Sequence, residues 1–548
     1  MTRLFLFLSL VFFFTTLQSQ ELSSSQRERI DQIVQWSVSA DTPGSAVGIV
    51  RGGEIVYEKY VGVEDVKSAT PIDEGTVFNI ASNGKQFTAC LVLELIQQGQ
   101  LQLGDDIRKF LPEILSAYSK SVTVQQLLNH SSGIRDVYDL WDIQGIVWWK
   151  TPGLSNAKAL ALLAQQQSPQ FSPGTEYAYS NSNYLLLAEI IARITAKPFA
   201  AYAQERLKAW GLTQSFFLAD HRQAIPNLAK PYFDFGKWYY YRWRSSLHGD
   251  GALFTTLGDQ LKWEAQLQTQ SSQSTFLSAS QKALPIEGEN RYGYGLNFGD
   301  YRGLPLRSHS GATGAWKAYF MRFPAQDLSI VVMTNSGAVN PPGVGRRIAN
   351  ALLEDEFAES PPFPLGPGLV TDQLDESDLP GTYALENNFY FRIVQNGDSW
   401  QLERPNRDPI TIEKEEGDLF HEVGDPAFKQ HFALNDEGEQ TLTAYYPSHA
   451  PYTLTKLEAF PANFQAQQWS GKYRNVELGL IVQLVYEEEH IFKLIFRGAK
   501  RQKRSGQLIS PTRMRAEGYG VEFLDVDGQQ QLLLTNNRAR GVQFDRIN

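Results

Sequence analysis

The sequence has very little cysteine, and this scarcity limits the folds and sites open to it. Cys90 is the only cysteine among 548 residues, so no intramolecular disulfide can form and zinc sites built on cysteine pairs are excluded. The eight histidines contain no HExxH pair, and no Walker-type glycine-lysine loop is present. We therefore expect no metal and no cofactor, and domains held together by their hydrophobic cores.

Positive charge and long apolar stretches are also scarce. The formal net charge is −10 and the pI about 5.5, which argues against nucleic acid as a partner. An apolar run over residues 4–17 follows Met1-Thr2-Arg3, and it is shorter than the roughly 18 residues that a membrane span needs. The pattern predicts a signal peptide over 1–19, no stable membrane insertion, and a mature protein that is periplasmic or secreted.

The length indicates more than one domain, because single hydrophobic cores stop growing near about 250 to 300 residues. Proline and glycine crowd residues 361–368, a composition typical of a linker. Beyond it the pattern changes to short strands and turns, and Gly381 and Tyr383 recur as Gly471 and Tyr473, each 90 positions later (471 − 381 and 473 − 383). We predict a first domain over 20–360, a linker over 361–376, and two related β-barrel-like domains over 377–458 and 467–548, each a small closed barrel or sandwich.

The first domain shows a mixed α and β pattern. Strand-like segments at 46–50 and 55–60 are joined by a glycine-containing turn, which predicts a hairpin. The expected fold class is α/β (α+β), with an antiparallel sheet flanked by helices. Apolar periodicity predicts the helices over 27–38, 82–98, 122–129, 156–167, 182–196 and 345–354.

A serine and a lysine stand three residues apart at the start of the predicted helix over 82–98. Ser82 and Lys85 would therefore lie on one face. A serine hydroxyl is a weak nucleophile until a base takes its proton, and a lysine that burial keeps neutral can serve as that base. The motif alone is weak evidence, because Ser155 and Lys158 repeat it in what looks like an ordinary surface helix.

Further segments in the same order make the first copy specific. Tyr179-Ser180-Asn181 follows 97 residues after Ser82 (179 − 82), and His309-Ser310-Gly311 precedes a glycine-rich turn and a strand. With these segments the chain from about residue 27 to 353 resembles the serine β-lactamase and penicillin-binding-protein-like superfamily, in the branch of class C β-lactamases and D-aminopeptidases.

The resemblance implies a role for each matching position. Ser82 would be the acylated nucleophile, Lys85 its proton partner, and Tyr179 the residue that moves protons to and from the substrate. Asn181 would bind the substrate amide and hold Lys85. Gly311 and Ala312 would line the substrate, and the backbone N–H groups of Ser82 and Ala312 would form the oxyanion hole.

The chain departs from class C β-lactamases at His309, which stands where those enzymes carry a lysine. Because histidine is mostly neutral near pH 7, a substrate with a carboxylate beside the scissile bond is less favoured. His130 is interpreted as a structural residue at a helix end. The aromatic clusters at 148–149 and 238–243 either wall a substrate cleft or pack between domains.

The function predicted from the resemblance is that of an exported serine hydrolase working through an acyl-enzyme. The partner would be a small molecule or short peptide, and a peptidase acting on small peptides with D-residues is favoured. An esterase or β-lactamase of the same fold remains an alternative. A second alternative is a non-catalytic protein that binds cell-wall fragments.

Overall fold

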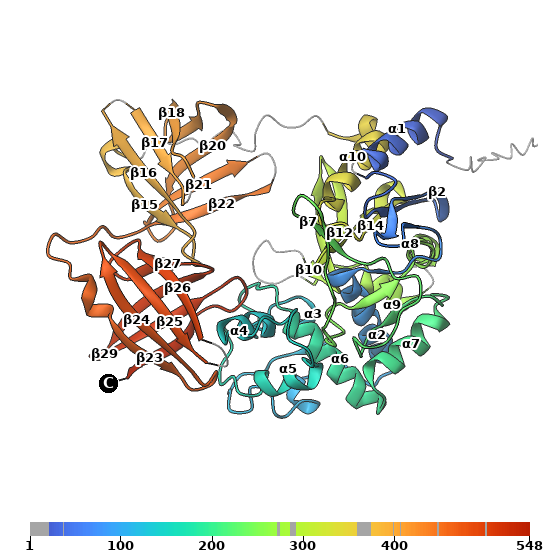
Figure 1. Ribbon diagram of the computed structural model, residues 1–548, viewed down its shortest axis with the longest axis horizontal. Coiled ribbons are helices and arrows are strands. Elements are labelled where there is room, and N and C mark those ends of the chain that lie inside the picture. Colours follow the sequence, from blue (N-terminus) through green and yellow to red (C-terminus); the bar gives the residue numbers. More distant parts are fainter. Residues whose placement is uncertain are drawn as a thin grey trace, which may run out of the picture.

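Three units make up the computed structural model: a mixed α and β unit and two closed β-barrels (Figure 1). The structure describes residues 21–36, 38–270, 274–284, 292–358, 374–397, 399–405, 407–446, 449–498 and 501–547. The predicted signal peptide and most of the predicted linker lie outside them. The fold class is confirmed, whereas the domain limits given above stay predictions.

A seven-stranded antiparallel sheet forms the centre of the first unit, and residues from both ends of that unit build it. The N-terminal hairpin pairs through Ser45–Arg51 with Leu328–Thr334, which lies about 280 positions later along the chain. The strand order is β10 (Tyr292–Gly293), β11 (Leu296–Tyr301), β12 (Leu304–Thr313), β13 (Trp316–Phe323), β14 (Leu328–Thr334), β1 (Ser45–Arg51) and β2 (Glu54–Val61).

Helices cover both faces of the central strands, so β1 and β14 are buried on both sides. Val47 and Ile49 pack against α1 (Ser24–Gln35) and α10 (Pro341–Leu353), whereas Ala46 and Val50 belong to the larger core on the opposite face. That core contains α2 (Lys85–Gln97), α3 (Val124–Leu128), α4 (Val137–Ile143), α5 (Asn156–Leu163), α6 (Asn181–Thr195), α7 (Phe199–Ala209), α8 (Leu257–Gln270) and α9 (Thr275–Ser280).

Short strands complete the first unit. They are β3 (Val63–Asp65), β4 (Thr70–Pro71), β5 (Phe78–Asn79), β6 (Phe216–Phe217), β7 (Tyr232–Asp234), β8 (Trp238–Tyr240) and β9 (Leu253–Thr255). Two predicted helices begin earlier than expected. Ser23 caps α1 in a capping box with Gln26. Asn340 caps α10, with Pro341 at the first helical position, where proline needs no N–H partner.

Each C-terminal unit is an eight-stranded barrel that closes by pairing its last strand with its first, which leaves no free edge. The first contains β15 (Gly381–Ala384), β16 (Tyr390–Asn396), β17 (Ser399–Glu403), β18 (Ile410–Glu416), β19 (Leu419–Glu422), β20 (Asp425–Leu434), β21 (Gln440–Tyr446) and β22 (His449–Lys456). The second contains β23 (Gly471–Asn475), β24 (Leu480–Glu488), β25 (Ile491–Arg497), β26 (Arg501–Leu508), β27 (Arg513–Ala516), β28 (Tyr519–Val526), β29 (Gln529–Thr535) and β30 (Val542–Ile547).

The sequence repeat corresponds to the same structural device in both barrels. Tyr383 and Tyr473 are completely buried, and their hydroxyls donate to the carbonyl oxygens of Leu379 and Trp469, at 2.8 and 3.0 Å. The two carbonyls are also 90 positions apart (469 − 379). Each tyrosine therefore ties the residues before the first strand to the barrel interior.

The second barrel lies directly against α4 and α5 of the first unit (Figure 1). Its interior belongs to the same continuous core as the helices of the first unit. The Tyr519 hydroxyl donates to Asp142 at 2.8 Å, and the Gln144 side chain donates to the carbonyl of Leu478 at 3.0 Å. Among the described residues, no helix is both long enough and apolar enough to span a membrane.

A buried ion pair links the sheet to α8 and allows a test of this core. Arg322 of β13 contacts Glu264 at 2.6 Å, with side chains 6% and 1% exposed. Glu264→Ala should lower the free energy of unfolding by about 3 to 5 kcal/mol, because it leaves a buried guanidinium without its counter-charge. Thermal and denaturant unfolding would measure the change.

The matched control is Glu205→Ala, since the Lys197–Glu205 pair is 48% and 55% exposed. Its loss should cost under about 1 kcal/mol. Equal effects of the two substitutions would contradict a supporting role for the buried pair.

Candidate active site

Ser82 lies on a tight turn at the entrance of a buried helix. It belongs to a 3-10 turn, Ala81–Gly84, that runs directly into α2. Ala81 has a φ of 48°, a conformation that costs a non-glycine residue energy and that clusters at functional sites. The turn therefore presents the Ser82 hydroxyl to a cleft instead of burying it.

Lys85, one helical turn later, is completely buried. Its Nζ donates to Ser82 Oγ at 3.2 Å, to Asn181 Oδ1 at 2.8 Å and to the carbonyl oxygen of Asp250 at 2.5 Å. Burial lowers the pKa of Lys85 to about 7, and the Asp250 carboxylate opposes this shift. A large fraction of the lysine is therefore the neutral amine near neutral pH, as a base for Ser82 requires.

Tyr179, just before α6, faces the same serine. Both residues line the same cleft, and Lys85 Nζ is 5.0 Å from the centre of the Tyr179 ring. Burial raises the pKa of Tyr179 above its ordinary value, although the Ser82 hydrogen bond and the Arg538 guanidinium act in the opposite direction. At neutral pH the phenol keeps its proton, so it is an acid in this state and Lys85 is the stronger base.

Asn181 starts α6 and is held by a carboxylate that the sequence did not reveal. Its backbone N and its Nδ2 both donate to Asp136 Oδ2, at 2.7 and 2.8 Å. Asp136 is completely buried. Because this carboxylate fixes both the backbone N and Nδ2, Asn181 Oδ1 is oriented toward Lys85.

His309, on β12, is buried and neutral. Its Nδ1 faces the carbonyl oxygen of Ser310 at 2.7 Å and therefore carries the proton, and its Nε2 accepts from the Tyr292 hydroxyl at 3.0 Å. Burial, together with the charge of Lys85, lowers the pKa of His309 to about 3. The sequence-based expectation that this position carries no positive charge agrees with this environment.

Gly311 allows β12 to pass very close to the Ser82 turn. A Cβ atom at this position would lie 2.3 Å from the carbonyl oxygen of Ile80 and 3.1 Å from the backbone N of Ser82. Only glycine fits such an approach. Ala312 follows it and lines the cleft together with Ser82, and their pairing as an oxyanion hole stays a prediction.

His130 is a positioning residue at the end of α3. Its ring centre lies 4.3 Å from that of Tyr179, and its Nδ1 accepts from the Asn183 side chain at 3.0 Å. The second motif copy does not contribute to the cleft, because neither Ser155, the N-cap residue of α5, nor Lys158 is among the residues that line it.

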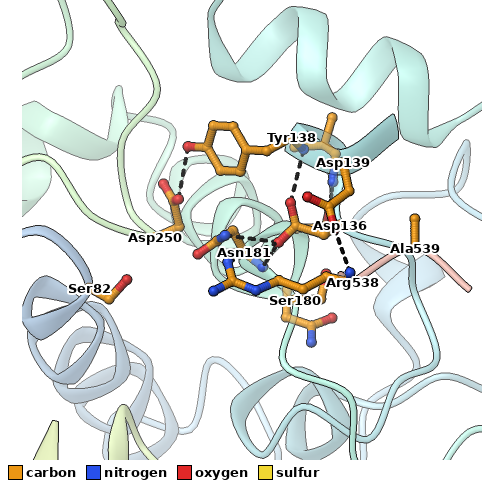
Figure 2. A network of polar contacts seen from close by, with 12 residues as sticks. Ser82, Asp136, Tyr138, Asp139, Ser180, Asn181, Asp250, Arg538 and Ala539 are labelled. Atoms are coloured by element: carbon orange, nitrogen blue, oxygen red, sulfur yellow. Dashed lines mark hydrogen bonds and ion pairs between the residues drawn. The ribbon is translucent and has the colours of Figure 1, made fainter. Parts of the chain in front are cut away.

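A cleft of about 440 Å³ opens at Ser82. Trp148 and Trp243 line it, which favours the cleft-wall interpretation for one member of each aromatic cluster. Tyr138 also lines the cleft and donates to Asp250 Oδ2 at 2.9 Å (Figure 2). Its other lining residues include Tyr179, Asn181, His309, Ala312, Asp139, Asp250 and Arg538.

The sequence reasoning missed Asp136, which is buried behind Asn181, and three charged residues that line the cleft: Asp139, Asp250 and Arg538 (Figure 2). Asp136 and Asp139 lie shortly after the segment 127–134 that carried part of the resemblance, so their position could have been noticed. Nothing in the sequence pointed to Arg538, which belongs to the second barrel. Across the ranges that the structure describes, no group of three or more His, Cys, Asp or Glu side chains could hold a metal ion.

Comparison with known proteins identifies the family. The Beta-lactamase family model matches residues 27–355, more than half of the chain. The chain belongs to the beta-lactamase family. The matched region contains the antiparallel sheet with nearly all of its flanking helices, and the two barrels follow it.

Several relatives and one solved structure share this similarity. Protein flp of Staphylococcus aureus (strain N315) is 26% identical over 334 residues, 57% of this chain and 64% of that protein. A D-aminopeptidase of Cereibacter sphaeroides (strain ATCC 17029) is 27% identical over 339 residues, 59% of this chain and 62% of that protein. The chain thus spans a little under two thirds of these relatives. The octameric penicillin-binding protein homologue from Pyrococcus abyssi has a TM-score of 0.55 at 23% identity, covering 79% of this chain and 99% of that one.

The pKa of Lys85 predicts a pH profile. The rate at which a fluorophosphonate labels Ser82 should rise with pH and level off above the pKa of Lys85, about 7, because only the neutral amine can take the serine proton. Lys85→Met should remove this rise and slow labelling by about 10² to 10⁴-fold.

Asp139 provides the control, because burial and the Asp136 carboxylate raise its pKa to about 7 as well. Asp139→Asn should leave the midpoint of the profile in place. If the midpoint disappears in Asp139→Asn but remains in Lys85→Met, the titrating group is Asp139, and the prediction that Lys85 is the base is wrong.

Gly311 permits a second test. Gly311→Ala should push β12 away from the Ser82 turn and lower the labelling rate by about 10²-fold, the effect of misplacing reacting groups by about 1 Å. Gly299→Ala on neighbouring β11 is the control, because a Cβ atom there meets nothing within 4 Å. A normal rate in Gly311→Ala would show that the close approach is not needed for the site.

Proposed function

We propose that the chain is a serine hydrolase that works by two-step acyl transfer, and that its substrates are small peptides containing D-residues. The observation that carries the proposal is the completely buried Lys85, whose Nζ lies 3.2 Å from Ser82 Oγ and whose pKa of about 7 is set by burial. A buried lysine of this kind supplies the base that a serine nucleophile needs.

In the first step, Ser82 Oγ attacks the substrate carbonyl and its proton passes to the neutral Lys85 amine. The tetrahedral oxyanion would be bound by the backbone N–H groups of Ser82 and Ala312, and removing such a donor typically costs about 3 kcal/mol of transition-state stabilisation. Tyr179 then protonates the leaving amine, and the Lys85 ammonium returns a proton to the phenolate. The carbon–nitrogen bond breaks and the acyl-enzyme forms.

In the second step, water attacks the acyl carbonyl. The same neutral lysine takes the proton of the water, either directly or through Tyr179, and Ser82 Oγ leaves with a proton. Asn181 keeps Lys85 in place through the 2.8 Å contact of its Oδ1. The two steps consume one water and restore every proton.

The choice of substrate is supported by the similarity to a protein named D-aminopeptidase and by the neutral His309, which sets this cleft apart from a lysine-bearing one. The aromatic walls suit a small acyl group with an apolar side chain. We also propose that the protein is exported, on the basis of the signal-peptide pattern over 1–19. An esterase or β-lactamase would use the same residues.

The proposal is tested by turnover of four compounds with the full chain and its Ser82→Ala variant. The panel is D-alanyl p-nitroanilide, a tripeptide ending in D-Ala-D-Ala, p-nitrophenyl butyrate and nitrocefin. Cleavage of the D-alanyl compounds that is lost in Ser82→Ala is expected.

Cleavage of only the ester or only nitrocefin would replace the peptidase with one of its alternatives. No turnover together with no fluorophosphonate labelling would contradict the hydrolase and favour a protein that binds cell-wall fragments.

A further inference from the structure

The second barrel contributes an arginine to the Ser82 cleft. The loop 536–541 joins β29 to β30 and reaches the catalytic unit, and Arg538 lines the same cleft as Ser82. Figure 2 shows its side chain extending past Asp136, with the guanidinium directed toward Ser82. Its Cζ lies 4.7 Å from the centre of the Tyr179 ring.

The loop is bound on both flanks, so its position is built into the fold. The Arg538 backbone N donates to Asp139 Oδ2 at 2.5 Å, and its carbonyl accepts from Asp136 N at 3.2 Å. Arg135 Nε donates to the carbonyl of Arg540 at 3.0 Å, and Arg540 N donates to Gln170 Oε1 at 2.8 Å. These contacts hold the loop against α4. Because the backbone of the loop is anchored, the guanidinium at the end of the long Arg538 side chain has fewer positions open to it than it would have on a mobile loop.

The N–H donors of the Arg538 guanidinium have no hydrogen-bond acceptor among the described residues. Its ion pair with Asp136 Oδ2 is 3.9 Å long, which is beyond hydrogen-bonding distance, and Asp136 already accepts from Asn181 and Tyr138. Within the described ranges, no protein oxygen accepts a hydrogen bond from the side chain of Arg538. Five N–H groups in a planar fork are thus free to face a ligand in the cleft.

The other groups of the cleft do not supply a charge of this kind. His309 is neutral because burial lowers its pKa to about 3, and Lys85 loses its proton near its pKa of about 7. Asp139 and Asp250 are acidic groups whose pKa values burial raises, and a carboxyl group cannot supply positive charge in either protonation state. Arg538 brings a guanidinium to the cleft, the side-chain group that proteins use for a permanent positive charge.

We propose that Arg538 binds a carboxylate of the substrate on its leaving-group side, which narrows the substrates to peptides cleaved next to a C-terminal residue. This inference rests on the acyl-transfer function proposed above. Tyr179 is the acid for the leaving amine, and the guanidinium lies against the Tyr179 ring. A carboxylate one carbon away from the leaving nitrogen would therefore meet the guanidinium fork, which matches a carboxylate in two parallel hydrogen bonds.

The proposal reverses an expectation drawn from the sequence. The neutral histidine at position 309 argued against a substrate with a carboxylate near the scissile bond. The cation that position 309 lacks is supplied by another residue that lines the same cleft and belongs to a different unit of the chain.

The test compares D-alanyl-D-alanine with its C-terminal amide, two ligands that differ only in the carboxylate. Binding to the full-length Ser82→Ala protein is measured by calorimetry. The carboxylate form should bind about 10- to 100-fold more tightly, the range of hydrogen bonds to a charged group. The added substitution Arg538→Gln should remove this preference, and Arg538→Lys should keep part of it.

Arg540→Gln is the matched control in the same loop, because the Arg540 side chain pairs with Glu386 at 3.0 Å and Glu176 at 3.5 Å and not with the cleft. It should keep the full preference. Thermal unfolding of each variant shows whether the fold is intact.

The proposal is overturned if Arg538→Gln and its parent discriminate equally between the two ligands, or if the parent binds neither ligand or both alike. Turnover is scored separately with Ser82 present. If the binding preference depends on Arg538 but no substrate is turned over, the proposed acyl-transfer function is contradicted. The proposal that Arg538 binds a carboxylate is supported by the same result.

Discussion

The burial of Lys85 is the constraint on which the site depends. An ammonium group without water is costly, so the protein both lowers the pKa of this lysine and surrounds its Nζ with three acceptors. Those acceptors come from the Ser82 turn, the start of α6 and the segment before β9. The buried amine therefore requires three distant parts of the chain to meet at one point, and their packing also sets the position of Ser82.

The position of Lys85 depends in turn on the carboxylate of Asp136, which holds its partner Asn181. Asp136 orients Asn181 through two contacts of 2.7 and 2.8 Å, and its backbone N binds the carbonyl of Arg538 from the second barrel. Asp136 thus contacts both Asn181, the partner of Lys85, and Arg538 in the loop of the second barrel. A barrel that docks at this segment is coupled to the geometry of the site, because displacing it would disturb the support of Asn181.

The charges in the cleft depend on burial, because burial favours the neutral form of an ionisable group. Lysine, histidine and two carboxylates all have pKa values that burial shifts toward their neutral forms. A guanidinium stays charged even where burial lowers its pKa, because its ordinary pKa is so high. Placing the permanent charge on a partly exposed arginine, and the titratable charge on a buried lysine, separates the recognition of an anion from the transfer of protons.

The sequence by itself indicated the fold class, the hairpin, six of the helices, the repeat of the two barrels, and Ser82, Lys85, Tyr179 and Asn181 as candidates for one site. These features depend on local periodicity and on ordered motifs, which one chain displays directly. The charge state of Lys85, the support from Asp136 and the entry of Arg538 were decided only by the tertiary structure. Burial is a property of packing, and Arg538 lies 456 positions from Ser82 (538 − 82), with no local pattern to mark that the second barrel would dock beside the nucleophile.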